Sequence, residues 1–298
     1  MKLLQSILIV ISILFMLVLL LDQWHEIESL EFKIRYHFLI LSFLLLIPVF
    51  FLDAFGWYLI LRAIGHKPPL LPSVRVWMVS SITRYLPGGI WAYASRATMS
   101  RELGIDLKTA LISLYIETIL LIASSFIIGL PALLSVSNLS GKIWVPVIAI
   151  FILGLLLHPR IFSVFKFLPG DLGQKLGSLT LLSHRHTFAL YLYYIFFWIL
   201  FCLVFLFFVL AIYPLSSDNW IIAGSSIAFG FLLGFIIIFV PGGIGIRESA
   251  IYFLLLPIIP SLPCLIISIG SRIWVITAEI ISTLTTILVN RRTKIHNG

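Results

Sequence analysis

The stretch FALYLYYIFFWILFCLVFLFFVLAIY, residues 188–213, contains no charged side chain. A bilayer's hydrocarbon core is about 30 Å thick and needs roughly 20 apolar residues in a helix, whose backbone groups are all satisfied internally. This stretch therefore predicts a transmembrane helix. The whole chain agrees, because 61% of it is hydrophobic and 11% charged, against about 45–50% and 25% in soluble domains. The sequence predicts an integral membrane protein.

Further apolar runs lie on both sides of this stretch. The run 143–157 is shorter but bounded by Gly141 and Pro159, whereas Val74–Leu86 and Ala250–Leu262 are too short to cross easily and touch prolines. We expect these last two to be re-entrant or broken half-helices. The runs of spanning length are Leu3–Leu21, Phe38–Leu61, Leu111–Leu134, Trp220–Val240 and Cys264–Val289.

The fold predicted is an all-α polytopic membrane protein with about seven to eight transmembrane helices. We expect one integral membrane domain over residues 1–298, because no stretch has the composition of a soluble core. The run Leu3–Leu21 is interpreted as a retained helix, since no small-residue cleavage site follows it. Tryptophans fall largely near the ends of the runs, which is typical of an aromatic belt.

Lysines and arginines gather in three segments, which predicts that those segments are cytoplasmic. The loops between them hold few cations, as expected of loops on the outer side. Every loop then has a consistent side of the membrane if both chain ends are cytoplasmic. The net charge of +8 then reflects contact with anionic lipid at the inner face of the cytoplasmic membrane, and nucleic acid is not an expected partner. The three clusters are Arg62, Lys67 and Arg75; Arg160, Lys166, Lys175 and Arg185; and Arg291, Arg292 and Lys294.

A short motif occurs twice. Pro87-Gly88-Gly89-Ile90 recurs as Pro241-Gly242-Gly243-Ile244, and each copy follows an apolar segment and precedes a shorter, arginine-bearing stretch and then a full span. Transporters are often built from duplicated halves whose broken helices form the substrate site. The candidate halves here are residues 38–157 and 188–290, and chance recurrence of Pro-Gly-Gly is the alternative.

Each motif is predicted to break a helix at Pro87 or Pro241. Proline has no amide hydrogen, and paired glycines relieve the steric limits on the backbone, so one helix ends and another begins. The new helix presents free amide hydrogens and a positive dipole end, which suit phosphate, and arginine holds phosphate oxygens in a bidentate manner. The candidate lipid-phosphate site consists of Arg84, Gly88, Gly89, Arg96, Gly242, Gly243, Arg247 and Arg272.

Several of these residues also have an alternative interpretation in which their role is purely structural. Arg84, Arg96 and Arg101 could instead extend to the cytoplasmic interface as anchors. Arg272 and Glu279 lie inside a long apolar span, about two helical turns apart on one face, where a charge costs about 3 kcal/mol or more. That face belongs either to a structural ion pair or to a transport pathway.

Four intramembrane acids are singled out: Asp53, Glu117, Glu248 and Glu279. The acids Asp53 and Glu117 each stand alone in an apolar run, so each is either functional or hydrogen-bonded to a neighbouring helix. No hydrolase, metalloprotease or nucleotide-binding motif is present. We therefore expect no catalytic residues, no cofactor and no metal, and interpret His184 and His186 as interface residues.

The residues around the two breaks form two motifs that resemble those of a known family. Arg84-Tyr85-Leu86-Pro87-Gly88-Gly89 and Pro241-Gly242-Gly243-Ile244-Gly245-Ile246-Arg247-Glu248 resemble the paired signatures of the lysylphosphatidylglycerol synthase transmembrane-domain family. In multiple peptide resistance factors that domain is the flippase half, and related stand-alone domains accompany glycosyltransferases. The resemblance implies functional roles for Arg84, both breaks, Arg247, Glu248 and Arg272. The soluble aminoacyltransferase domain of the fusion proteins has no counterpart here, so lysyl transfer is not expected.

The leading hypothesis is a lipid translocase that moves an anionic or aminoacylated phospholipid, or a polyprenyl-phosphate-linked lipid, across the cytoplasmic membrane. A first alternative is a non-transporting membrane partner that holds a lipid-linked substrate for a glycosyltransferase. A second is a membrane-embedded transferase acting on a lipid phosphate, with Glu248 or Glu279 as the base. The expected partners are membrane lipid and either a glycosyltransferase or further copies of the chain.

Overall fold

The computed structural model describes residues 33–85, 90–136, 184–236 and 243–296, and the side chains of these ranges except 184 and 290–296. All regular elements in these ranges are helices, which confirms the all-α prediction. The predicted spans Leu3–Leu21 and 143–157 lie outside them. Five described helices are long and apolar enough to cross a membrane: α3 (Tyr36–Ala63), α6 (Leu107–Leu134), α9 (His184–Ile212), α10 (Trp220–Ile236) and α12 (Ser261–His296).

Short helices stand where the sequence predicted half-helices. Before the first Pro-Gly-Gly motif come α4 (Leu70–Ile82) and the 3-10 turn η1 (Thr83–Tyr85), and after it α5 (Trp91–Met99) and η2 (Ser100–Leu103). After the second comes α11 (Ile246–Leu255), and the short turn η4 (Ser217–Asn219) precedes α10.

One boundary was predicted wrongly. The piece Ala250–Leu262 is not a single element, because α11 begins earlier, at Ile246, and already ends at Leu255. Pro257 and Pro260 follow, and the residue before a proline disfavours the helical conformation. The next helix, α12, begins immediately after the second proline, at Ser261.

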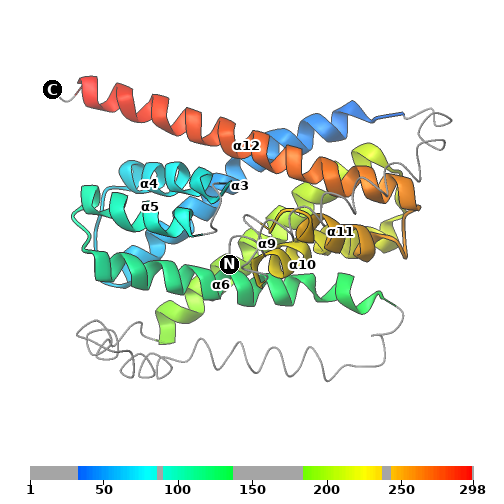
Figure 1. Ribbon diagram of the computed structural model, residues 1–298, viewed down its shortest axis with the longest axis horizontal. Helices are drawn as coiled ribbons and strands as arrows, with labels where there is room; N and C mark the ends of the chain where they lie inside the picture. Colours follow the sequence, from blue (N-terminus) through cyan, green and yellow to red (C-terminus); the bar gives the residue numbers. More distant parts are fainter. Residues whose placement is uncertain (1–32, 86–89, 137–183, 237–242, 297–298) are drawn as a thin grey trace, which may run out of the picture.

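The helices form one closely packed bundle. Helix α3 packs on α9, α10 packs on both α6 and α11, and α12 runs across α4, α3 and α11 (Figure 1). Small residues allow the closest approaches, as is usual between membrane helices. A Cβ on Gly129 of α6 would lie 2.9 Å from the backbone nitrogen of Phe229 in α10. This contact sets the α6–α10 spacing.

The tryptophan prediction needs correction. Trp57, Trp77, Trp198 and Trp274 are buried inside the bundle and do not form a belt. Each indole N–H donates a hydrogen bond to another helix: Trp57 to Ser113 Oγ, Trp77 to Glu117 Oε1, Trp198 to the carbonyl of Leu121, and Trp274 to Ser42 Oγ. A buried indole needs such a partner, so these bonds fix helix register. Trp91 and Trp220 are exposed, as a belt would require.

Candidate functional site

The start of α11 is shaped by two glycines. Gly243 and Gly245 have φ of +65° and +82°, a region that other residues rarely adopt. The Gly245 amide donates to Oε2 of Glu248, three residues into the helix, so this carboxylate caps the helix and faces its positive end. Glu248 thus stabilises the start of α11, while its second oxygen stays available for a different partner.

That partner is Arg272 of α12. Its Nε lies 3.7 Å from Glu248 Oε1, and its guanidinium carbon lies 5.4 Å from the centre of the Tyr85 ring. The Nη2 atom is buried and has no hydrogen-bond partner among the described residues. One side of this guanidinium is therefore paired and the other keeps unused donor capacity.

Arg247, the neighbour of Glu248, approaches the same place from α11. Its guanidinium carbon stands 4.5 Å from the centre of the Phe231 ring, and its Nε is buried without a hydrogen-bond partner in the described structure. The side chain crosses α10 at Gly234, where an added Cβ would collide with the Cγ of Arg247. Because Gly234 has no side chain, it leaves the space through which Arg247 passes α10.

The third arginine, Arg84, comes from η1, directly before the first break. Its Nε donates to the carbonyl of Ser81 at 2.9 Å, and its Nη2 lies 3.3 Å from Oε1 of Glu279. The Tyr85 hydroxyl donates to the other oxygen of Glu279 at 2.6 Å. Glu279, with its side chain only 1% exposed, therefore ties the first break to α12.

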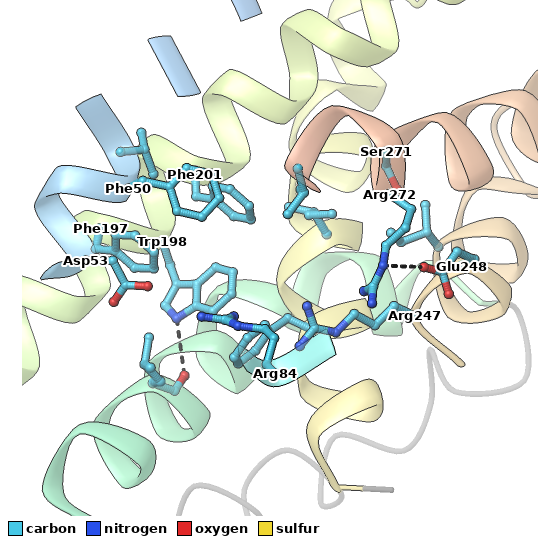
Figure 2. A pocket seen from close by; sticks show the side chains of 16 residues that line it. Phe50, Asp53, Arg84, Phe197, Trp198, Phe201, Arg247, Glu248, Ser271 and Arg272 are labelled. Carbon is cyan, nitrogen blue, oxygen red and sulfur yellow. Dashed lines mark hydrogen bonds and ion pairs between the residues drawn. The ribbon is translucent and has the colours of Figure 1, made fainter. Parts of the chain in front are cut away.

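The three arginines and Glu248 line one pocket of about 70 Å³. A buried water needs about 10–15 Å³ of such volume, so the pocket has room for several waters or one phosphate-sized group. Figure 2 shows Arg84, Arg247 and Arg272 reaching toward it from three elements, with Asp53 on the side of the aromatic residues. The aromatic wall consists of Phe50, Phe197, Trp198, Phe201 and Phe231.

Arg96 lies in a different cluster. Its side chain is 6% exposed and its Nη1 donates to Glu117 Oε2. Its Nε and Nη2 donate to the hydroxyls of Ser80 and Ser81 at 3.0 and 3.1 Å. Trp77 donates to the remaining oxygen of Glu117 at 2.6 Å. In this structure Arg96 has protein partners on all three nitrogens. Glu117 thus has the geometry of the structural alternative, in which its carboxylate is hydrogen-bonded to neighbouring helices.

The structure gathers part of the predicted site. Arg84, Arg247, Arg272, Asp53 and Glu248 line the pocket, and Glu279 pairs with one of them. Gly243 packs against the backbone of Gly234. Sequence reasoning missed the aromatic wall and the roles of Tyr85 and Gly234, for which no local pattern gives a signal. The predicted residues Pro87, Gly88, Gly89, Pro241 and Gly242 lie outside the described ranges.

Comparison with known proteins agrees with the sequence motifs. A family model described as the lysylphosphatidylglycerol synthase TM region matches residues 4–278. The match covers both Pro-Gly-Gly motifs and every residue that lines the pocket. No curated protein matches the chain.

Proposed function

Because this chain belongs to the lysylphosphatidylglycerol synthase transmembrane-region family, whose function concerns membrane lipid, we propose that it is a lipid translocase. The pocket takes the phosphate-bearing headgroup of an anionic or aminoacylated phospholipid, or of a polyprenyl-phosphate-linked lipid. Transfer through the pocket then carries the headgroup across the cytoplasmic membrane.

One observation carries this proposal: three arginines from three separate elements meet at one pocket, and two of them have a buried nitrogen with no hydrogen-bond partner among the described residues. Unpaired buried cations are costly inside a membrane and mark binding sites for anions. Guanidinium groups are suited to phosphate, because their planar donors match its oxygens in pairs.

The ion pairs that the described residues form around the pocket leave one arginine out. Arg84 is paired with Glu279 and Arg272 with Glu248, whereas Arg247 has no acid at ion-pair distance among the described residues. A bound phosphodiester would supply the partner that Arg247 lacks. It would also accept the free donors of Arg247 Nε and Arg272 Nη2.

The size of the pocket indicates which part of a lipid enters. About 70 Å³ suits a headgroup phosphate but excludes acyl or isoprenyl chains, and the bundle around it consists of apolar spans. The chains therefore stay in the bilayer while the polar group passes the arginines. No chain has to be extracted into water, which would otherwise be the largest cost.

The test uses proteoliposomes that contain trace fluorescent phosphatidylglycerol, bleached from outside by dithionite. Wild type should expose inner-leaflet probe faster than protein-free liposomes, and Arg247→Ala should slow this about tenfold or more. The matched control is Arg75→Ala, which removes an arginine from the exposed pair with Glu102 and should leave the rate unchanged. Headgroup binding without transfer would favour the non-transporting lipid-holding partner, and equal rates in all samples would refute the translocase.

A further inference from the structure

Asp53 is the acid of the pocket that the ion pairs leave unused. It comes from α3 and lines the pocket beside the aromatic wall, and its Oδ1 is buried without a hydrogen-bond partner in the described structure. Glu248 and Glu279, in contrast, are held by a helix start, a tyrosine hydroxyl and two arginines. Within the described ranges, Asp53 therefore has no evident structural task.

Charged and titratable groups face Asp53 from the elements packed around it. Positive charge comes from Arg84 and Arg96, and negative charge from Glu117 and Glu279. The neighbouring α9 adds the titratable hydroxyls of Tyr193 and Tyr194. Since Glu117 and Glu279 are each engaged by an arginine, Asp53 is the acid here whose protonation breaks no ion pair.

An anionic headgroup in this pocket would meet the Asp53 carboxylate. Both would be negatively charged in a space of about 70 Å³, where apolar walls replace part of the water that would otherwise screen them. Two anions sharing a buried site disfavour each other, and a proton on one of them removes the conflict. The headgroup phosphodiester is a strong acid, so the proton would bind to the carboxylate.

We propose that Asp53 is a proton-binding site that takes up one proton as the anionic headgroup enters the pocket; this rests on the proposed lipid translocation. The proton comes from the water phase on the side of entry, converts the carboxylate to the neutral acid, and leaves to the water phase on the other side with the headgroup. For a lipid with one negative charge, the cycle moves no net charge. A proton gradient then gives the transport its direction.

Binding of phosphatidylglycerol to the purified protein, measured between about pH 5 and pH 10, tests the proposal, because a buried carboxyl can keep its proton up to about pH 8–9. If one proton is taken up, wild-type affinity should rise by up to about tenfold for each unit by which the pH falls. Asp53→Asn, which keeps the side-chain shape, should bind at every pH about as tightly as wild type at the acidic end. Glu102→Gln, which neutralises an exposed acid, should keep the wild-type slope.

A second measurement needs no variant. At the alkaline end of that range, where the unliganded carboxyl is ionised, adding phosphatidylglycerol to wild-type protein in weakly buffered solution should raise the pH, by about one proton per bound lipid. An unchanged pH on binding would overturn the proposal, as would equal slopes in wild type and Asp53→Asn. It would also fall if Asp53→Asn lost a preference for amine-bearing headgroups without any pH dependence, because Asp53 would then bind an ammonium. In these outcomes the lipid still binds, whereas absence of binding at every pH would refute the translocase itself.

Discussion

Arg96 and Arg247 are both buried arginines, yet their surroundings differ in kind. Arg96 donates to an acid and two hydroxyls and lies 4.9 Å from the centre of the Trp77 ring. Arg247 has an aromatic ring beside it and a buried nitrogen for which the described part of the chain offers no hydrogen-bond partner. The first arrangement is complete and holds helices together, whereas the second is open to a ligand.

The Arg96 pair should therefore matter for stability. Glu117→Gln leaves a buried guanidinium without its acid and should lower the free energy of unfolding by about 3 kcal/mol, measured by thermal unfolding in detergent. The double variant Arg96→Met with Glu117→Leu should be closer to wild type than either single change, because no buried charge remains. A single variant as stable as wild type would contradict this assignment.

At the scale of the elements, the two breaks are followed by the same order of parts: a short helix and then a long one. A charged residue of each short helix pairs with one of the next long helix, Arg96 with Glu117 and Glu248 with Arg272. The arginine is on the short helix in the first pair and on the long helix in the second. The first pair is closed by the protein, and the second shares its arginine with the pocket.

The crossing of α10 and α11 gives a sharp test. Gly234→Ala would place a Cβ against the Arg247 side chain and force that arginine out of the pocket. We expect phosphatidylglycerol affinity to fall about tenfold with little change in thermal stability. Gly224→Ala is the control, because it adds the same methyl group to the same helix but meets Cys202 of α9. Unchanged affinity in Gly234→Ala would show that the path of Arg247 is unimportant.

The start of α6 is capped by Asp106, which accepts from the amides of Lys108 and Thr109 at 3.1 and 3.3 Å. The hydrogen bond from Thr109 lowers the pKa of Asp106 below its ordinary 3.8. The stabilisation is therefore complete above pH 3.8 and is lost as the pH falls through the lowered value. Asp106→Ala should cost about 1 kcal/mol of unfolding free energy at neutral pH, a difference from wild type that disappears in strong acid. A difference that persisted there would contradict the cap.

At the scale of the whole molecule, the pocket joins most of the described bundle. Its lining comes from α3, η1, α6, α9, α10, α11 and α12, and Glu279 and Glu248 link α12 to the segments at both breaks. A ligand at the arginines would therefore contact parts of the chain that are far apart in sequence. Binding of such a ligand would therefore stabilise the whole described bundle against unfolding.

Anionic lipid should accordingly raise the unfolding temperature. At about 100 times its Kd, phosphatidylglycerol should add about 2.7 kcal/mol to the unfolding free energy of wild type. Arg247→Ala should lose most of this gain and Arg75→Ala should keep it. An equal gain from phosphatidylcholine would mean that the bilayer, and not the headgroup site, stabilises the protein.

The sequence by itself determined the membrane class, the five long helices that the structure describes, and the short helices beside the Pro-Gly-Gly motifs. Hydropathy and backbone limits are local properties, so they can be read from neighbouring residues. It also identified Arg84, Arg247 and Arg272 as related. Only the tertiary structure decided that these three share a pocket while Arg96 does not, and which acid each one faces. Arg84 of η1 and Glu279 of α12 meet because helices pack through faces whose partners no local pattern specifies.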